Sequence, residues 1–449
     1  MLSKLLSFII IGFSAISFAQ ITSTSPYSYY GLGEMDGQDH AIFSGLGNST
    51  ITYFDSTVLN YYNPASYNTL SKGQPIFSTG LSSRLSNYKQ GDVTNFNKAI
   101  IVNHFAFGLS LGKYVGVAVG LKPYSRRGYN FYETQAIGSD TVRNIYSGSG
   151  STNELFFGLA TDLIHLKKVR LSVGSNIGYV FGSVSNLKTS YLITKDSSAG
   201  ISEKLTKLSA VHYQIGMFFK HILNEKHSYT LSSVIEPQQD FFNHQSESIF
   251  YASNLANANT FITLSSTGLQ AGQYKIAPSL TIGINYAFLF KDLKKGNNFR
   301  NSELSTHISY NTTDWTKFSS IYGETSTNFN LNATTKINFG VQYTPEVQMT
   351  EKSAQGTFLE KTKYRFGVYQ YTLPFLQSGS KITDKAFTLG FGFPVLTQRS
   401  LSSINFGFTL GARGTTNANL LSEKYYGINL GLSFAPSIFE RWFIKRKLD

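Results

Sequence analysis

The chain has 449 residues, contains no cysteine and carries a formal net charge of +13, with 39 Lys and Arg against 26 Asp and Glu. The absence of cysteine excludes a disulfide-stapled fold, a cysteine-anchored lipoprotein and a cysteine-ligated metal site. Only 14% of the residues are charged whereas 15% are aromatic. Soluble domains usually carry about 25% charged residues, so this composition is typical of a membrane β-barrel. A large soluble β-sandwich, or two such domains, is the alternative.

Residues 1–19 have the features of a cleavable secretory signal peptide. Lys4 precedes an apolar run over residues 5–18, and Ala19 ends a small-residue cleavage motif ahead of Gln20. After this segment the sequence has no run of about 20 apolar residues, which a membrane-spanning helix requires. We therefore expect an exported protein of the outer membrane of a Gram-negative bacterium, in which strands cross the membrane.

Residues 43–67 form the segment around which the rest of the sequence is organised. Its distinctive residues are Gly45, Gly47, Asp55, Asn63, Pro64 and Ala65. Pro64 fixes its own φ and favours an extended Asn63. The segment therefore predicts a turn just before the first strand.

This segment resembles the N-terminal region of the FadL-type family of outer-membrane long-chain fatty-acid transporters. In that family a glycine-bearing stretch is followed by an acidic residue and a YYNPA element, here residues 61–65. The resemblance implies a barrel of about 14 strands whose N-terminal segment lies in the lumen as a hatch. It also implies diffusion of a hydrophobic molecule from an outward groove through the lumen, with release when the hatch shifts or through a wall opening. A turn ahead of any β-barrel would account for the same residues.

Four glycines are candidates for hatch movement, because glycine changes its backbone conformation at low cost. They are Gly31, Gly33, Gly45 and Gly47.

Alternation of apolar with small or polar residues recurs to the end of the sequence and predicts an all-β, transmembrane antiparallel barrel. In the last example, Ile428, Leu430 and Leu432 alternate with Asn429 and Gly431. Such a strand suits a position between lipid and a filled lumen, whereas a soluble sandwich would carry more Lys and Glu. The fourteen predicted strands are residues 75–88, 99–112, 115–129, 152–163, 169–184, 208–220, 228–236, 277–290, 302–312, 335–345, 364–374, 385–395, 402–413 and 425–435. Any even number is admissible, so twelve or sixteen strands are alternatives.

The connections between these strands alternate in length. With the N-terminus in the periplasm, the outward connections include the long polar stretches 130–151, 185–207, 237–276 and 313–334. The inward connections include the short stretches 113–114, 162–168 and 221–227. Long outside and short inside is the asymmetry of outer-membrane barrels. Residues 346–363 form a long inward connection, which indicates either a misplaced strand or a periplasmic feature.

The tail after the last strand, residues 436–449, is aromatic and basic. Trp442 and Phe443 suit the membrane interface, and Lys445, Arg446 and Lys447 suit lipid head groups. A solvated basic tail is the alternative. The tail resembles the C-termini of Bacteroidota outer-membrane proteins, including the PorV-like members of the FadL-type family that serve type IX secretion.

Motifs for chemistry are weak. Residues 108–112 spell G-x-S-x-G, but Ser110 lies in an alternating strand and not in the strand–turn–helix that a nucleophile elbow needs. The eight histidines lack zinc-binding spacing, although His104 and His212 fall on strands and could face the lumen. Gly31 and Gly33 lack the context of a dinucleotide-binding loop. We therefore expect no catalysis, no cofactor and no metal, and an outer-membrane lipase using Ser110 is the least favoured function.

Lys122, Arg126 and Arg127, near the outer end of the third predicted strand, are the candidate contacts for a ligand or a lipid head group. A guanidinium group pairs well with a carboxylate, so these residues suit the head of an amphipathic acid. Anchoring lipopolysaccharide or lining the rim is the plainer interpretation. The basic residues of the whole chain are scattered, so nucleic acid is not an expected partner.

The sequence thus predicts a signal peptide at 1–19, a hatch at 20–74, a barrel at 75–435 and a tail at 436–449. The predicted function is passive uptake or passage of hydrophobic, fatty-acid-like small molecules. The alternative is a barrel that moves no small molecule and docks on a type IX-like secretion complex or its cargo. An aromatic and aliphatic lumen would favour passage, and a lumen packed shut by polar side chains would favour docking. The expected partners are accordingly outer-membrane lipid with either a hydrophobic small molecule or a secretion-complex protein.

Overall fold

The computed structural model describes residues 25–29, 31–35, 40–193, 198–254, 260–290, 299–323, 325–348, 357–377, 379–397, 400–415 and 420–435. The predicted signal peptide and the aromatic, basic tail with Trp442 and Phe443 lie outside these residues. Within the described ranges, no helix is long and apolar enough to cross a bilayer.

Fourteen antiparallel strands form a closed barrel, in which the last strand pairs with the first from Phe77–Phe434 to Lys89–Ser422. In ring order these strands are β2 (Ile76–Gln90), β3 (Val93–Ser110), β4 (Val115–Arg126), β6 (Asp140–His165), β7 (Val169–Leu192), β8 (Ala199–Ile222), β9 (His227–Glu236), β13 (Ser279–Phe290), β15 (Ser302–Thr313), β18 (Thr334–Thr344), β20 (Lys363–Gln377), β21 (Ser380–Thr397), β22 (Ser400–Gly414) and β23 (Ser422–Phe434). Each overlaps one of the fourteen strands expected from the sequence, so the predicted barrel is confirmed.

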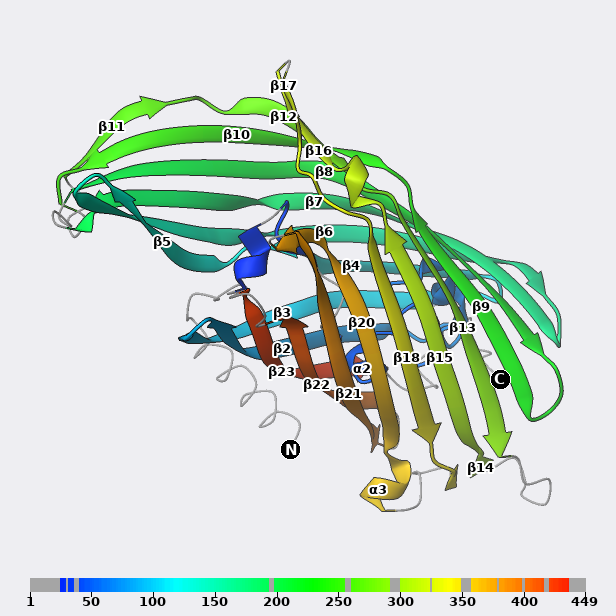
Figure 1. Ribbon diagram of the computed structural model, residues 1–449. Coiled ribbons are helices and arrows are strands. Elements are labelled where there is room, and N and C mark those ends of the chain that lie inside the picture. Colours follow the sequence, from blue (N-terminus) through cyan, green and yellow to red (C-terminus); the bar gives the residue numbers. More distant parts are fainter. Residues whose placement is uncertain are drawn as a thin grey trace.

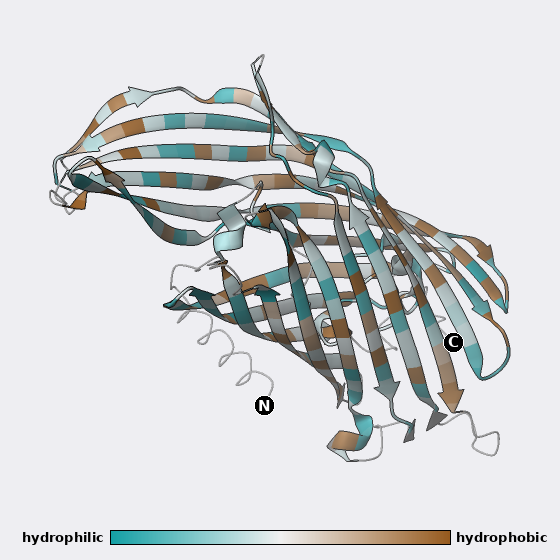
Figure 2. Ribbon diagram, in the orientation of Figure 1, coloured by the Kyte–Doolittle hydropathy of each residue, from teal (hydrophilic) through white to brown (hydrophobic). Residues whose placement is uncertain are grey.

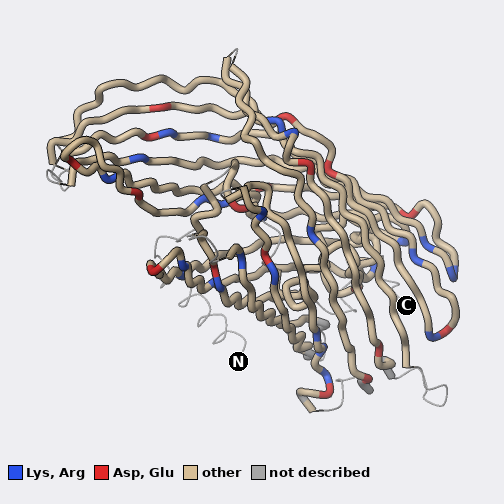
Figure 3. The backbone as a smooth tube through the Cα atoms, viewed as in Figure 1, with Lys and Arg blue, Asp and Glu red and all other residues tan. Residues whose placement is uncertain are grey.

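The last strand shows how the sequence builds the wall. Tyr426 and Phe434 are 57% and 53% exposed, while Asn429 and Ser433 between them are buried. Apolar and polar residues alternate in this way along most strands (Figure 2), and charged residues are sparse along strands such as β13 (Figure 3). In a closed barrel the backbone N–H and C=O groups form hydrogen bonds between neighbouring strands, because lipid cannot provide such bonds. The outer surface is therefore suited to lipid.

On one side of the barrel the sheet continues as a curved extension (Figure 1). Strands β6, β7 and β8 have 26, 24 and 24 residues, more than the roughly 9–11 that cross a membrane. Their outer parts pair with β5 on one side and β10 on the other. The extension and the strands that pair with it comprise β5 (Tyr129–Ile137), β10 (Gln239–Ala252), β11 (Phe261–Ser266), β12 (Gln270–Ile276), β16 (Ser319–Tyr322) and β17 (Thr325–Asn328), and the short helix η5 (Trp315–Lys317) precedes β16.

The four long outward stretches expected as connections therefore contain strands. The sequence did not indicate these strands, because outside the membrane both faces of a sheet meet water and neither face needs large apolar residues. For example, β17 consists of two threonines, a serine and an asparagine, and every one of these residues is exposed. The polar composition that suggested loops instead belongs to a solvated sheet.

Residues 40–74 lie inside the barrel and include helix α2 (Ala41–Ser44) and the 3₁₀ helix η2 (Pro64–Thr69). The wall strands carry glycine where this segment touches them. A Cβ at any of these glycines would lie within 3 Å of an atom of the segment: Gly108, Gly116, Gly158, Gly174, Gly216, Gly283, Gly340, Gly367, Gly390 and Gly407. Real Cβ atoms do not approach so closely, so the segment and the wall fit only because these side chains are absent.

The inner end of the barrel carries a small structure of its own. Strand β14 (Phe299–Arg300) pairs with β19 (Val347–Gln348), and helix α3 (Phe358–Lys361) follows. The long inward connection at 346–363 is therefore a feature between two correctly placed strands, and no strand is misplaced there.

Candidate functional site

Residues 25–29 and 31–35, called here the N-terminal segment, lie across the outer end of the lumen and include the 3₁₀ helix η1 (Pro26–Tyr29) and strand β1 (Glu34–Met35). The Tyr27 hydroxyl donates a hydrogen bond to the Leu421 carbonyl at 2.8 Å. The Gly128 amide donates to the Ser28 hydroxyl at 3.0 Å. This N-terminal segment is therefore held both by the connection between β22 and β23 and by the residues between β4 and β5.

Apolar packing closes the same end. Tyr27 and Leu32 of the N-terminal segment belong to one buried cluster with Phe318 and Phe375 from the surrounding wall. The Tyr27 and Phe375 rings are stacked with their centroids 5.9 Å apart. The N-terminal segment is therefore held by apolar packing as well as by hydrogen bonds.

The barrel wall has a seam between β3 and β4. These strands pair only from Phe105–Leu121 to Ser110–Gly116, so in the described part of the chain residues 93–104 of β3 have no strand on that edge. The facing edge of β4 is taken up further along by β1, which pairs with it at two residues, Ser125 and Arg126.

The seam lies at the height of the lipid-facing belt. Through β2, Ile100 and Val102 of β3 align with Ile428 and Leu430 of β23. Irregular backbone is tolerated at membrane depth only where it is buried in protein or lines a cavity. A cavity is therefore expected behind the seam.

A cavity of about 330 Å³ lies there, within the range typical of small-molecule sites. Both sides of the seam contribute to its lining, with Ala99 and Ile101 from β3 and Tyr124 and Arg126 from β4. Much of the remaining wall is apolar: Tyr27, Leu32, Met35, Ile276, Leu331, Leu373 and Phe375. The cavity thus borders both the N-terminal segment and the lipid-facing wall.

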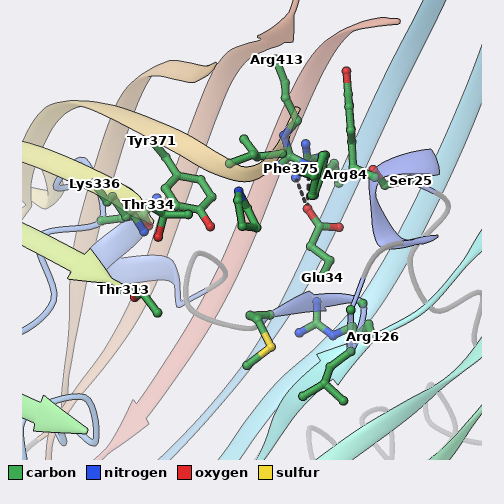
Figure 4. A pocket seen from close by; sticks show the side chains of 18 of the residues that line it. Ser25, Glu34, Arg84, Arg126, Thr313, Thr334, Lys336, Tyr371, Phe375 and Arg413 are labelled. Atoms are coloured by element: carbon green, nitrogen blue, oxygen red, sulfur yellow. Dashed lines mark hydrogen bonds and ion pairs between the residues drawn. The ribbon is translucent and has the colours of Figure 1, made fainter. Parts of the chain in front are cut away.

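One wall of the cavity carries two arginines and three carboxylates. Arg413 is paired with Glu34 and with Asp384, each at 2.9 Å. Arg84 is paired with Glu423 at 2.8 Å and with Glu34 at 3.5 Å. In Figure 4, Glu34 points from β1 toward both arginines, while Thr313, Thr334, Lys336 and Tyr371 lie on another wall. Glu34 therefore ties the N-terminal segment to β2 and β22.

The family model of BamG matches residues 1–449 of the sequence. The chain belongs to the BamG family. A search of curated protein sequences finds no match.

Solved structures place the BamG-family chain among FadL-type barrels. It is similar to the toluene transporter TodX of Pseudomonas putida, with 12% identity, a TM-score of 0.55 and coverage of 90% of this chain and 99% of that chain. It is similar to the monoaromatic hydrocarbon channel CymD, with 12% identity, a TM-score of 0.53 and coverage of 89% and 98%. A FadL homologue of Pseudomonas aeruginosa is 10% identical, with a TM-score of 0.53 and coverage of 90% and 99%. The fold is that of a FadL-type outer-membrane barrel, as the sequence resemblance implied. The relation to PorV-like proteins stays a prediction.

All three cationic candidates either lie within the barrel wall or face the lumen. Arg126 lines the cavity and is 8% exposed. Arg127 donates hydrogen bonds to the Gly31 carbonyl and, at 2.9 Å, to Asn186. Lys122 pairs with the buried Glu154 at 3.3 Å. Of the three, Arg126 is the one beside the space that a ligand could enter.

The motif residues of the lumenal segment anchor it to the wall. Asp55 pairs with Lys363 at 2.5 Å and accepts a hydrogen bond from the Thr57 amide at 2.9 Å. Burial by itself would raise the pKa of Asp55, but the Lys363 ammonium group and the bonds from Thr57 hold that pKa well below its usual range. Asp55 is therefore a charged tether near the inner end of the barrel.

The Asn-Pro-Ala element begins η2 inside the lumen. Asn63 accepts a hydrogen bond from the Ala65 amide at 3.1 Å and donates one to the Ile51 carbonyl at 3.0 Å. Pro64 is the first residue of the helix, where its missing N–H costs nothing. Here the turn predicted from the sequence becomes a capped helix packed on Gly174 and Gly216.

The histidines and Ser110 have structural surroundings. His104 and His212 are buried on the lumenal side, as expected, and His212 pairs with Glu154 at 3.0 Å. Ser110 ends β3 and donates a hydrogen bond to the Gly112 carbonyl at 3.0 Å. Among the described residues, no group of three or more His, Asp or Glu side chains is placed to hold a metal ion.

His40 makes the lumenal segment sensitive to acid. Its ring stacks on that of His104 with the centroids 4.8 Å apart. Burial lowers the pKa of His40 well below its ordinary value, and His104 and Arg365 lower it further. The folded state therefore keeps this ring neutral, whereas the unfolded chain protonates it below about pH 6.5. Its contribution to stability is present above that pH and is lost as the pH falls.

We expect a His40→Phe variant to lose less stability than the wild type on going from about pH 7 to about pH 5, because the ring that gains a proton on unfolding is gone. The temperature at which the folded, heat-modifiable band disappears on a gel measures this. His244→Phe is the matched control, because His244 is exposed on β10, and should follow the wild type. An equal loss in all three proteins would contradict the role of His40.

Several site residues were not indicated by the sequence. Arg84 and Glu423 are 339 positions apart and meet only because β2 pairs with β23. Arg84 is a charged residue between Ser82 and Ser86 on the inward face of β2, which is a usable signal once a closed barrel is assumed. Glu34 and Ile101 carried no such signal.

Proposed function

We propose that the protein is a passive route through the outer membrane for amphipathic, largely apolar small molecules with an acidic head, as fatty acids are. A molecule would enter the cavity past the N-terminal segment and leave sideways into lipid through the seam between β3 and β4. Export by the predicted signal peptide would bring it to that membrane.

The observation that carries this proposal is the cavity behind the seam. The cavity borders Ala99 and Ile101 of β3, in the stretch whose seam edge has no strand in the described part of the chain, and the neighbouring Ile100 and Val102 are level with the lipid-facing belt. Its aromatic and aliphatic wall suits a hydrocarbon chain, and Arg126 and Lys336 suit a carboxylate. TodX is a toluene transporter and CymD a monoaromatic hydrocarbon channel, whereas Arg126 and Lys336 here favour an acid over a pure hydrocarbon.

The seam supports a sideways exit because the lumen below the cavity is occupied. Residues 40–74 meet ten wall glycines at close distance, from Gly108 to Gly407. A straight route to the inner end would require that whole segment to move. Exit through the seam would require only the N-terminal segment to shift.

An Arg126→Met variant is expected to pass a fatty acid about tenfold or more slowly, because a hydrogen bond to a charged group contributes about 1.5–3 kcal/mol. The fatty alcohol of equal length should be affected much less, since it has no carboxylate. The measurement is uptake of both labelled compounds by vesicles that contain the purified barrel.

Arg143→Met is the matched control, because Arg143 lies in the extension beside Tyr132 and outside the cavity. A wild-type barrel that passes neither compound above empty vesicles would refute the proposed function. Equal slowing of acid and alcohol in Arg126→Met would refute the role of the guanidinium group.

The filled lumen favours one second candidate, a barrel that moves no small molecule and docks on a secretion complex or its cargo. Polar groups contribute to this filling, for example Asn176 on Tyr67 at 2.8 Å. If no amphiphile co-purifies or passes and the barrel is isolated intact with a defined secretion complex, docking is favoured.

A further inference from the structure

Three short turns at the inner end of the barrel lie next to one another. They join β3 to β4, β6 to β7 and β8 to β9. The Asp162 amide donates a hydrogen bond to the Tyr114 carbonyl at 2.9 Å, which connects the first turn to the end of β6. The Ile222 amide donates one to the Lys168 carbonyl at 2.8 Å, which connects the second turn to the third. The turns therefore form one continuous stretch of the inner rim.

Aromatic rings at this stretch indicate the level of the lipid head groups. The Tyr114 and His165 rings meet edge to face with their centroids 5.6 Å apart. The His221 and Tyr229 rings do the same at 5.5 Å. Tyr229 lies two positions before Leu231 on β9 and so on the same, lipid-facing side, where Leu231 is 46% exposed. Outer-membrane barrels carry a girdle of aromatic residues at each membrane interface.

The apolar outer surface of the wall continues onto these turns. Higher on the wall, Leu159 of β6 and Ile215 of β8 are 49% and 52% exposed. Around the turns, six large apolar side chains are 40–67% exposed: Leu111, Tyr114, Leu163, Ile164, Leu166 and Leu223. Water alone would not favour so many exposed apolar groups at one rim. The turns are therefore an extension of the lipid-facing surface.

The same turns carry positive charge. Residues 111–115, 162–170 and 220–227 contain six Lys and Arg against two Asp and Glu, a balance of +4. Glu303 of the nearby β15 acts electrostatically on Lys220, and counting it lowers the balance to +3. Figure 3 shows Lys and Arg at the right-hand ends of these strands, where the turns lie. Four of the lysines are exposed on the turns: Lys113, Lys167, Lys168 and Lys226.

The combination of apolar and cationic groups selects the kind of partner. One of the two acids is withdrawn from the surface, because the buried Asp162 carboxylate pairs with Arg170 at 2.9 Å. A soluble acidic protein would account for the lysines but not for the exposed leucines beside them. A neutral lipid would account for the leucines but not for the lysines. A lysine can lay its stem along apolar surface while its ammonium group reaches a phosphate, so an anionic lipid accounts for both.

We propose that this stretch of the inner rim is a binding site for anionic phospholipid of the inner leaflet, of the phosphatidylglycerol type. Its phosphate lies among the ammonium groups of Lys113, Lys167 and Lys168, and its acyl chains lie against Leu163 and Leu166. The lipid fixes the depth of the barrel in the membrane at this side. The proposal goes beyond passage of small molecules and does not depend on it.

The test uses the full chain in a neutral detergent and counts bound lipid by native mass spectrometry. Phosphatidylglycerol and phosphatidylcholine with the same acyl chains are added in turn. The wild type is expected to bind phosphatidylglycerol at least tenfold more tightly, since each basic residue near the membrane adds attraction for an anionic head group. The turn variant should lose at least tenfold in affinity for phosphatidylglycerol and keep its affinity for phosphatidylcholine; it carries Lys113→Gln, Lys167→Gln, Lys168→Gln and Lys226→Gln.

A matched variant separates the site from net charge. The outer variant loses four charges from exposed lysines in the extension and at the outer end of β2, and should bind phosphatidylglycerol like the wild type; it carries Lys89→Gln, Lys188→Gln, Lys204→Gln and Lys207→Gln. Arginine at the four turn positions should also preserve binding. All three variants must show the heat-modifiable band of a closed barrel, which is expected because every replaced lysine is exposed.

Three results would overturn the proposal. The first is equal binding of the two lipids by the wild type. The second is an equal loss of phosphatidylglycerol in the turn and outer variants, which would show that only net charge matters. The third is binding of a hexaglutamate peptide in preference to phosphatidylglycerol, which would indicate an acidic protein partner instead. Fatty-acid uptake by the turn variant, measured in vesicles of phosphatidylcholine, reports on the proposed function separately.

Discussion

Oxidation of a Met35→Cys, Ser125→Cys variant, which replaces register partners of β1 and β4, is expected to reduce fatty-acid passage to the level of empty vesicles. The N-terminal segment closes the outer end by packing Tyr27 and Leu32 into the cluster with Phe318 and Phe375. A covalent bond from β1 to β4 prevents the shift that opens the cavity. Uptake by vesicles, measured before and after reduction of one preparation, checks this.

A second disulfide controls for stiffening of the barrel in general. Ile284 and Ile308 are register partners on β13 and β15, away from the seam and outside the lining of the cavity. Oxidised Ile284→Cys, Ile308→Cys protein should pass fatty acid as the wild type does. If the Met35–Ser125 pair is fully oxidised and passage continues, entry past the N-terminal segment is wrong.

The second large effect is expected from Gly47→Val. Gly47 has φ +61, and a Cβ there would lie 2.4 Å from the Phe339 carbonyl oxygen and 2.5 Å from that of Val368. Positive φ costs a side chain about 1–2 kcal/mol, and overpacking adds typically 1–3 kcal/mol. We therefore expect a loss of roughly 2–5 kcal/mol in the free energy of unfolding, or a barrel without its lumenal segment in place.

Urea unfolding followed by tryptophan fluorescence and by heat-modifiability measures this loss. Gly200→Val is the matched control, because nothing lies within 4 Å of a Cβ built at Gly200 on β8, and it should unfold like the wild type. A Gly47→Val barrel as stable as the wild type would show that the segment does not need the close fit. Gly47→Ala should lie between the two if the valine variant does not fold.

The wall of the barrel could be predicted from the sequence because lipid imposes one rule on every strand. An apolar residue must occur at each second position, as at Tyr426, Ile428 and Leu432, and this period is visible without any partner strand. The strands of the extension do not need an apolar residue at each second position. Strands such as β17 expose every residue and are held by pairing with a neighbouring strand, so their residues read as polar connections.

The candidate site could be predicted only in part. Arg126 was singled out as a cation near the outer end of a strand, and it does line the cavity. The seam was not foreseeable, because it depends on where β3 stops pairing with β4, and pairing is a property of two distant segments. Gly45 and Gly47 were interpreted as points of movement. The structure instead gives close approach to Gly390 and Val368 as a sufficient reason for glycine at both positions.

The interlock between residues 40–74 and the wall glycines constrains the order of assembly. The segment precedes β2 in the chain, yet it contacts strands as late as β23, the last one. The ring is closed by the pairing of β2 with β23, its first and last strands. A closed ring offers no room to thread in a chain that fits between wall backbones so tightly. The wall strands must therefore assemble around the segment before the ring closes. The pairing of β2 with β23 then encloses the segment.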